Sequence, residues 1–318
     1  MPHNEKNRSF ICPSTRKFFH ASRANQNHSF GDFVHGYIYG RWTYTYISVA
    51  KGTHPLTKIL EPLFSFITFL FPRPNVDVRN QSAKNNTKIT FADGYHGKVM
   101  PLDKASKLIT VNKPINMPDL EQVIPYKRAR AIILENPDHI ALLKCPCRAA
   151  QEKPCQPEDV CLIIGDPFAG FIVEHHPDKA RWISQQEAVK ILAAEEARGH
   201  VHHAFFKDAM LDRFYAICNC CSCCCGAINA HRNGTPMLAS SGYVSEVDQT
   251  LCIGCGLCSD FCQFDAINTI DGLTTVDFEK CMGCGVCAGK CEQEAVRFRL
   301  EPAKGAPLDI CALQRQQE

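Results

Sequence analysis

Residues 252–262 read Cys252-Ile253-Gly254-Cys255-Gly256-Leu257-Cys258-Ser259-Asp260-Phe261-Cys262, and residues 281–291 repeat this C-x2-C-x2-C-x3-C spacing. Three thiolates separated by two residues each let a short loop curl around one metal–sulfur cubane. The intervening glycines permit tight turns and bring backbone N–H groups close to the sulfides. Each run therefore predicts ligands of an iron–sulfur cluster.

The repeat has a period of 29 residues and extends beyond the cysteines. Val247-Asp248 aligns with Val276-Asp277, and Ala266-Ile267 aligns with Ala295-Val296. Repetition of a whole unit predicts that both halves fold alike. Between them, Asp271-Gly272 predicts a two-residue hairpin turn.

At these residues the chain resembles the bacterial-type ferredoxins that carry two [4Fe–4S] clusters. In that family the fourth cysteine of each run binds the other cluster. The resemblance therefore implies two ligand sets: Cys252, Cys255, Cys258 and Cys291 for one cluster, and Cys281, Cys284, Cys287 and Cys262 for the other. It also implies a pseudo-twofold fold with the clusters within electron-tunnelling range.

One departure from the family pattern is that Gln263 and Glu292 replace the usual proline after the fourth cysteine. We expect this change to loosen the turn and to admit a polar side chain near the cluster.

The cysteine content of the whole chain favours metal ligation over disulfides. There are 20 cysteines among 318 residues, and all but Cys12 and Cys311 lie between Cys145 and Cys291. Disulfide scaffolds belong to small secreted chains, whereas the first 30 residues contain charges throughout and no apolar core typical of a secretory signal. We therefore expect a cytoplasmic protein of an anaerobic, reducing cell. The net charge of +2 gives no reason to expect nucleic-acid binding.

Two further cysteine groups lie upstream. The first has the spacing C-x-C-x7-C-x5-C and predicts one metal ligand set of Cys145, Cys147, Cys155 and Cys161. The second group contains six candidate ligands: Cys218, Cys220, Cys221, Cys223, Cys224 and Cys225. Adjacent residues of an extended chain point to opposite sides, so these six cannot all bind one cluster. Three alternatives stay open: a further Fe–S cluster, a zinc site formed across the two groups, or a redox-active dithiol.

The combination of both groups with the C-terminal repeat is similar to a group of multi-cysteine ferredoxin-like proteins of anaerobic bacteria. This resemblance implies cluster binding and electron transfer, and implies no substrate. The pairs His175-His176 and His202-His203 lie between the two groups. They are either metal ligands or ordinary hydrogen-bonded histidines, and the second interpretation is favoured. Arg148 is a candidate to offset cluster charge.

We predict an α+β fold with five regions. Residues 1–75 form an aromatic, basic N-terminal region, 76–117 a linker with a small β segment, and 118–235 a cysteine-rich α/β domain. Residues 242–300 form the ferredoxin-like domain with two [4Fe–4S] clusters, and 301–318 a tail. The apolar stretch 59–71 is too short to span a membrane. It is either a packing segment or a peripheral anchor at the inner face of the membrane.

Within the α/β domain, hydrophobic periodicity predicts a helix over 119–136 and strands over 139–143, 161–164 and 201–206. Ser184 and Glu187 have the spacing of a capping box, which predicts a helix that begins there.

The leading functional hypothesis is an electron-transfer protein that relays single electrons to a redox partner protein. The sequence has no dinucleotide-binding fingerprint, P-loop or separate radical-SAM run, which favours a carrier or redox subunit over a self-contained enzyme. The alternative is an oxidoreductase subunit with an open-site cluster near Cys218–Cys225. A third hypothesis is a binding protein that responds to metal or redox state.

Overall fold

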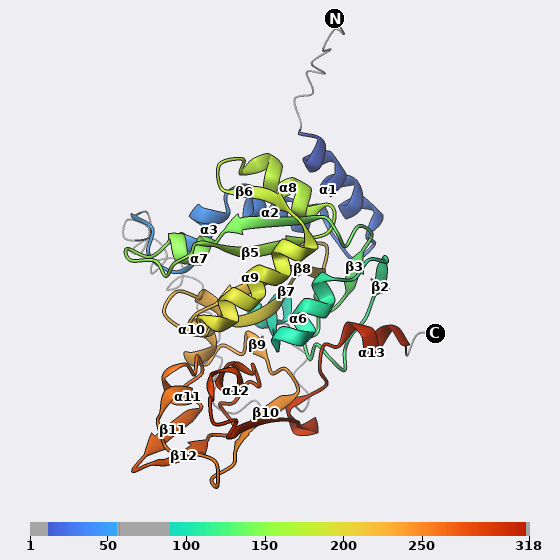
Figure 1. Ribbon diagram of the computed structural model, residues 1–318. Coiled ribbons are helices and arrows are strands. Elements are labelled where there is room, and N and C mark those ends of the chain that lie inside the picture. The colour runs from blue at the N-terminus through green and yellow to red at the C-terminus, as the bar shows by residue number, and fades with distance from the viewer. Residues whose placement is uncertain (1–11, 56, 58–89, 316–318) are drawn as a thin grey trace, which may run out of the picture.

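The computed structural model describes residues 12–55, 57 and 90–315 (Figure 1). The apolar segment 59–71 lies outside these described residues. Among the helices of the described part of the chain, none is long and apolar enough to cross a membrane.

A seven-stranded mixed sheet forms the centre of the molecule. In spatial order its strands are β6 (Ala180–Ile183), β4 (Ile140–Lys144), β5 (Asp159–Ile164), β8 (Arg213–Cys220), β7 (Val201–Lys207), β1 (Tyr95–Met100) and β9 (Leu238–Ala239). All neighbours are antiparallel except β1 and β9, which are parallel. The three strands predicted in this part of the chain are confirmed as β4, β5 and β7.

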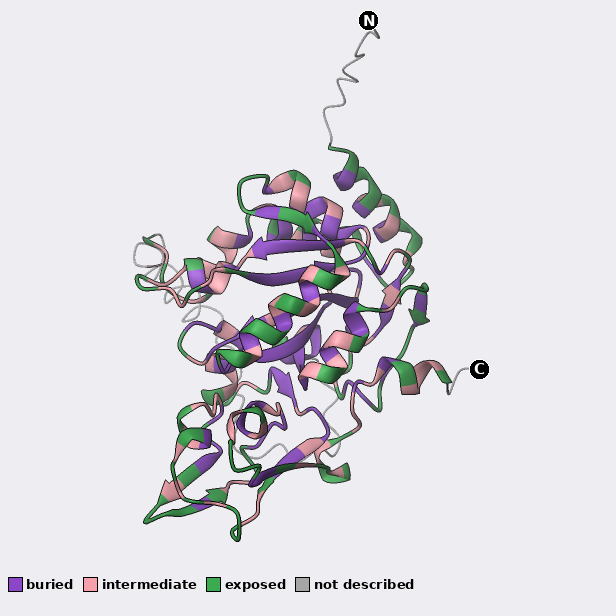
Figure 2. Ribbon diagram, in the orientation of Figure 1, coloured by how far each residue is buried: buried purple, intermediate pink, exposed green. Residues whose placement is uncertain are grey.

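Both faces of the sheet are covered, and the strands are buried on both sides (Figure 2). Alternate residues of each strand enter different cores: Ala141 and Leu143 pack on one side, whereas Ile140 and Leu142 pack on the other. This alternation follows from the pleat of the strand. Because both faces are buried, apolar residues follow one another in a strand such as β4, and the sequence shows a continuous apolar run.

Helices α6 (Leu102–Ile109) and α9 (Gln185–Ala197) cover one face (Figure 1). The Ser184 hydroxyl caps α9 by accepting a hydrogen bond from the Glu187 N–H at 3.1 Å, so the helix begins where the sequence predicted. Among the described residues, however, Glu187 forms no reciprocal bond that would complete a capping box. The Glu187 carboxylate pairs with Arg181.

The opposite face is covered largely by helices from the N-terminal region. These are α1 (Pro13–Ala24), α2 (Phe30–Arg41) and α3 (Thr43–Ala50), together with α8 (Phe168–His175) and the short α7 (Pro146–Ala149) and α10 (Gly226–Arg232). A Cβ atom on Gly36 of α2 would lie 2.1 Å from the carbonyl oxygen of Ala209, so glycine is required for this close approach. The described N-terminal helices are therefore part of the main core.

One expectation about the segment before β4 needs correction. The helix predicted over 119–136 is wrong: residues 118–131 form turns, and the short hairpin strands are β2 (Ile115–Met117) and β3 (Ile132–Leu134). Pro125 disfavours helical geometry at the residue before it, and Ala129 has a positive φ of 52°. In the described part of the predicted segment 76–117, strand β1 follows the short α5 (Phe91–Gly94) and belongs to the central sheet.

The cysteine repeat forms a smaller unit below the sheet in Figure 1. Its elements are β10 (Tyr243–Val247), α11 (Leu257–Asp260), β11 (Ile267–Ile270), β12 (Leu273–Val276), α12 (Val286–Lys290) and β13 (Val296–Leu300). The hairpin at Asp271-Gly272 is confirmed, with φ of 51° and 79°. The chain then passes η2 (Pro302–Lys304), and α13 (Ile310–Arg315) returns to pack on α6. The boundaries of the five regions stay a prediction.

Candidate cluster and metal sites

The first cysteine run, Cys252–Cys262, covers the loop after β10, the short helix α11 and the two residues that follow it. A cavity of about 300 Å³ in the small unit is lined by four cysteines, Cys252, Cys255, Cys258 and Cys291. The first three come from one run, and the last comes from the end of the other. The structure thus brings together the four cysteines of one implied ligand set.

The second run ends at Cys291, directly after α12. Its cysteines lie near Cys262, the last cysteine of the first run. Burial raises the pKa of Cys284 well above its usual value, and the neighbouring thiolates of Cys287, Cys262 and Cys281 raise it further. The Ser245 hydroxyl lies 3.1 Å from the Cys287 Sγ atom, and the Ala266 N–H donates to Cys262 Sγ at 3.2 Å. These polar groups suit sulfur atoms that carry negative charge.

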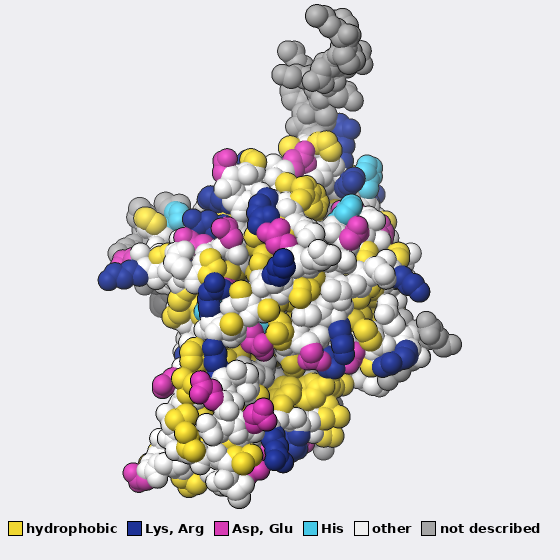
Figure 3. Space-filling view, viewed as in Figure 1, with side chains coloured by type: hydrophobic (Ala, Val, Ile, Leu, Met, Phe, Trp, Pro, Cys, Tyr) yellow, Lys and Arg dark blue, Asp and Glu magenta, His cyan; other side chains and the backbone are white. Residues whose placement is uncertain are grey.

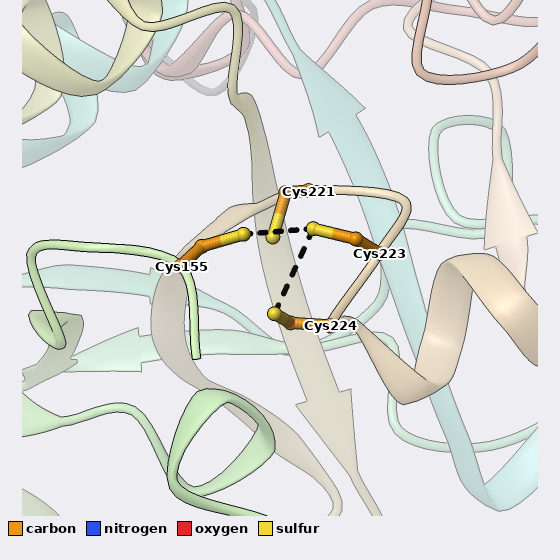
Figure 4. A group of neighbouring side chains, drawn as sticks. All are labelled: Cys155, Cys221, Cys223 and Cys224. Carbon is orange, nitrogen blue, oxygen red and sulfur yellow. Dashed lines mark hydrogen bonds between the residues drawn. The ribbon is translucent and has the colours of Figure 1, made fainter. Parts of the chain in front are cut away.

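The upstream cysteines divide into two sets, and the first is compact. The Sγ atoms of Cys155, Cys221, Cys223 and Cys224 all lie within 4.8 Å of one another (Figure 4). We call these four residues the outer set. Cys155 comes from the loop between α7 and β5, and the other three come from the turn that follows β8.

The remaining six upstream cysteines surround a mainly apolar cavity of about 70 Å³ on the face of the sheet covered by α2 and α3. We call them the inner set: Cys145, Cys147, Cys161, Cys218, Cys220 and Cys225. Cys221 and Cys224 also line this cavity, so the inner and outer sets are adjacent.

The thiols of the inner set contact one another. Cys145 interacts with Cys147 and Cys161, and Cys161 interacts with Cys218, strongly enough for each thiol to affect the pKa of its neighbour. The neighbouring Cys220 thiol lowers the pKa of Cys225, whereas Cys225 and burial raise the pKa of Cys220.

Three members of the predicted ligand set, Cys145, Cys147 and Cys161, line the inner cavity together, whereas Cys155 lies in the outer set. Cys145 and Cys161 lie near each other because β4 and β5 pair, with Leu143 opposite Cys161. The loop between them carries Cys155 away to the outer set. Sequence spacing alone could not reveal this, because the partners of Cys155 are more than 60 residues away.

Three tyrosines that were not among the residues predicted from the sequence also line the inner cavity. They are Tyr39 of α2, Tyr95 of β1 and Tyr215 of β8. The hydroxyls of Tyr39 and Tyr215 lie 2.8 Å apart, and the Lys207 ammonium lies 5.1 Å and 4.8 Å from the ring centroids of Tyr39 and Tyr95. No sequence motif marks them, because they come from three separate elements.

Two cations hold the loops that carry the upstream cysteines. The Arg148 guanidinium is buried, forms an ion pair with Glu195 at 2.8 Å, and donates to the carbonyl oxygens of Pro157 and Asn219. The Lys51 ammonium donates to the carbonyl oxygens of Cys147 at 2.9 Å and Cys224 at 2.7 Å. Arg148 thus positions the cysteine-bearing loops through a carboxylate and two carbonyls.

The model of the 4Fe-4S binding domain family matches residues 245–268 and 274–297. This segment is a 4Fe-4S ferredoxin domain. No curated protein and no solved structure matches the chain.

The ferredoxin domain contacts the sheet domain through Gln263, one of the two residues that replace the usual proline. The side-chain oxygen of Gln263 accepts a hydrogen bond from the Ser222 N–H at 2.7 Å, and its amide donates to the Gly199 carbonyl at 3.0 Å. The Phe261 ring packs against Gly199, where a Cβ atom would lie 2.3 Å from the ring. The polar side chain expected near the cluster therefore joins the ferredoxin domain to the turn that holds the outer set.

Replacing Gln263 by alanine is expected to loosen this junction. The Ser222 N–H loses its acceptor, which costs about 1–3 kcal/mol if the group stays buried. Amide hydrogen exchange across residues 218–225, measured by mass spectrometry, should become faster. Glu292→Ala is the matched control, because Glu292 has the equivalent position in the second repeat and is exposed. Equal protection in the two variants would show that Gln263 does not hold the junction.

Among the described residues, none of the four candidate histidines lines the inner cavity or belongs to the outer set, although His203 is opposite Cys218 in the pairing of β7 with β8. His175 lies 2.8 Å from the Thr15 hydroxyl, His176 lies 2.7 Å from the Gly40 carbonyl oxygen, and His202 bonds Asn219. His203 is fully buried, and its two ring nitrogens have no hydrogen-bond partner among the described residues. The favoured interpretation, ordinary hydrogen-bonded histidines, thus agrees with the contacts of the first three.

Proposed function

We propose that this protein relays single electrons through two [4Fe–4S] clusters held by its ferredoxin domain. The observation that carries the proposal is the sorting of its eight cysteines, in which the closing cysteine of each run lies with the first three of the other. When bound, such clusters supply one-electron chemistry. The protein contributes the thiolates, the loops and the N–H and hydroxyl groups that stabilise charge on sulfur.

The first ligand set lies where a redox partner protein could dock. Hydrophobic side chains occur at the surface of the ferredoxin domain (Figure 3). Ile253, inside the first run, is 68% exposed, and other large apolar residues exposed nearby are Leu251, Leu257, Ile270 and Leu273. Weak electron-transfer complexes use small interfaces of this kind. We therefore propose that electrons are exchanged with a partner protein at this end.

The second ligand set faces the opposite way, towards the sheet domain. Gln263 follows Cys262 directly and bonds Ser222, which lies between two residues of the outer set. This contact supports an internal relay from the ferredoxin domain to a metal or Fe–S site upstream. The large number of thiols also supports a reducing compartment for the protein.

The test begins with protein purified anaerobically and reduced with dithionite. Electron paramagnetic resonance should reveal two reducible clusters in the ferredoxin domain. Cys262→Ala should remove the cluster bound by Cys262 and the second run. The iron content should then fall by about four atoms per chain, because each cubane holds four. Cys311→Ala, at an exposed cysteine, serves as control. Clusters that dithionite cannot reduce would refute the proposal.

A second candidate function is an oxidoreductase subunit with a reducing site near Cys218–Cys225. The observation that favours it is the inner cavity, which is lined by both cysteines and three tyrosines. A small molecule that binds there should alter the resonance spectrum of the reduced protein, and Cys220→Ala should abolish that change. An unchanged spectrum with every small molecule tried leaves electron relay as the function.

A further inference from the structure

The inner and outer cysteine sets differ in the size of the group that they can hold. A tetrahedral zinc ion bound to four thiolates at about 2.3 Å holds the sulfur atoms about 3.8 Å apart. In the outer set all four sulfur atoms lie within 4.8 Å of one another. Cys223 Sγ is 3.7 Å from Cys224 Sγ and 2.8 Å from Cys155 Sγ, so Cys155 and Cys223 would separate by about 1 Å to bind one ion. This spacing suits a single metal ion.

The inner set does not suit a single ion. Its six thiols line an open space of about 70 Å³, which a single ion bonded to four of them would not fill. Protein interiors are close-packed, and few voids larger than a water molecule remain inside them. A cavity with six thiols at its wall is therefore built to be filled by a group larger than an ion.

The six thiols are carried by the central strands and by the segments that adjoin them. Cys161, Cys218 and Cys220 lie on central strands, while Cys145 and Cys225 immediately precede short helices. All six residues line the same cavity, so the strands and loops that carry them converge on one region. Structural cysteines with no ligand behave as small hydrophobic residues, which does not explain why six of them converge from four elements.

Positive charge lies between the two sets. The Lys51 ammonium bonds the backbone of Cys147 in the inner set and that of Cys224 in the outer set. A thiolate-bound centre carries net negative charge, and a cation beside it lowers the free energy of burying that charge. Lys51 comes directly after α3, so the same helices that cover the cavity bring this charge to it.

We propose that the inner set binds an iron–sulfur cluster, distinct from a single zinc ion in the outer set and from the two clusters of the ferredoxin domain. The upstream region then holds two separate metal centres side by side. This assignment goes beyond the proposed electron relay and does not depend on it, because the inner set shares no cysteine with the ferredoxin domain.

The test measures iron, acid-labile sulfide and zinc in the full-length protein purified anaerobically. We expect about 12 iron atoms and one zinc per chain, since three cubanes hold about four irons each. Cys161→Ala/Cys220→Ala should lose about four irons and keep the zinc. Cys155→Ala/Cys223→Ala should lose the zinc and keep the iron. Cys12→Ala/Cys311→Ala, which removes two exposed cysteines, should change neither.

Three results would overturn the assignment: about eight irons in the unaltered protein, full iron in the inner variant, or loss of zinc from the inner variant alone. The count in the unaltered protein decides the matter even where the inner variant does not fold. The resonance signals of the ferredoxin clusters separate this proposal from the electron relay. Absence of these signals, together with about four remaining irons that are lost from Cys161→Ala/Cys220→Ala, would refute the electron relay and support the inner cluster.

Discussion

Replacing Arg148 by methionine should lower the free energy of unfolding by about 3 kcal/mol, because removing one member of a buried ion pair leaves the other member poorly compensated. Arg148 and Glu195 are both almost fully buried. Burial opposes ionisation of Glu195, but hydrogen bonds from His200 and Arg148 hold its pKa below the usual value. Breaking a buried ion pair usually costs about 3–5 kcal/mol. We expect a cost at the lower end of this range because Glu195 keeps its contacts with Arg198 and His200. Methionine preserves most of the volume, so a cavity contributes little.

The measurement is urea unfolding, followed by far-ultraviolet circular dichroism under anaerobic conditions. Arg181→Met is the matched control, because Arg181 forms an exposed pair with Glu187 and such pairs contribute about 1 kcal/mol or less. Arg148→Met should also release the loops that carry Cys155 and Cys220, so metal content should fall with stability. Equal unfolding midpoints for the two variants would contradict the role given to Arg148.

Replacing Gly283 by alanine should destabilise the ferredoxin domain by about 3 kcal/mol. Gly283 has a φ of +63°, where a side chain is strained by about 1–2 kcal/mol. A Cβ atom there would also lie 2.1 Å from the Tyr243 carbonyl oxygen and 2.4 Å from the Ser241 hydroxyl, so backbone must move. Overpacking of this kind typically costs about 1–3 kcal/mol. Because Gly283 lies between Cys281 and Cys284, the shift displaces two ligands of the second set.

Iron content and the resonance spectrum of the reduced protein measure this effect, and about four irons should be lost. The control is Gly289→Ala in α12, where a Cβ atom meets nothing within 4 Å and φ is not positive. Alanine should be neutral or slightly stabilising at that helical position. Full cluster content in Gly283→Ala would mean that the loop tolerates the displacement.

The ferredoxin domain could be predicted from the sequence because its determinants are local. Cysteine spacing, glycines with positive φ such as Gly254, and the Asp271-Gly272 turn each act within a few residues. The same holds for the cap at Ser184. The helix predicted over 119–136 failed because Pro125 and the geometry at Ala129 outweighed an apolar spacing that arises here from turns.

The upstream sites could not be predicted in the same way. Cys155 meets Cys223 only because the loop before β5 reaches the turn after β8, and this depends on the order of strands in the sheet. The approach of Tyr39 to Tyr215 likewise depends on how α2 lies over the sheet. Gln263 was expected to loosen a turn, and its bonds to Ser222 and Gly199 instead join the two domains.

The cover over the inner cavity has a consequence for how the protein folds. Its lid comes from residues 39–47, which leave the ribosome first, whereas the thiols beneath come from residues 145–225. The proposed inner cluster would lie under α2 and α3, so its binding and the packing of these helices are coupled. A group that binds only the folded state adds its binding free energy to folding. Loading of the inner set should therefore stabilise the docked position of α2 and α3.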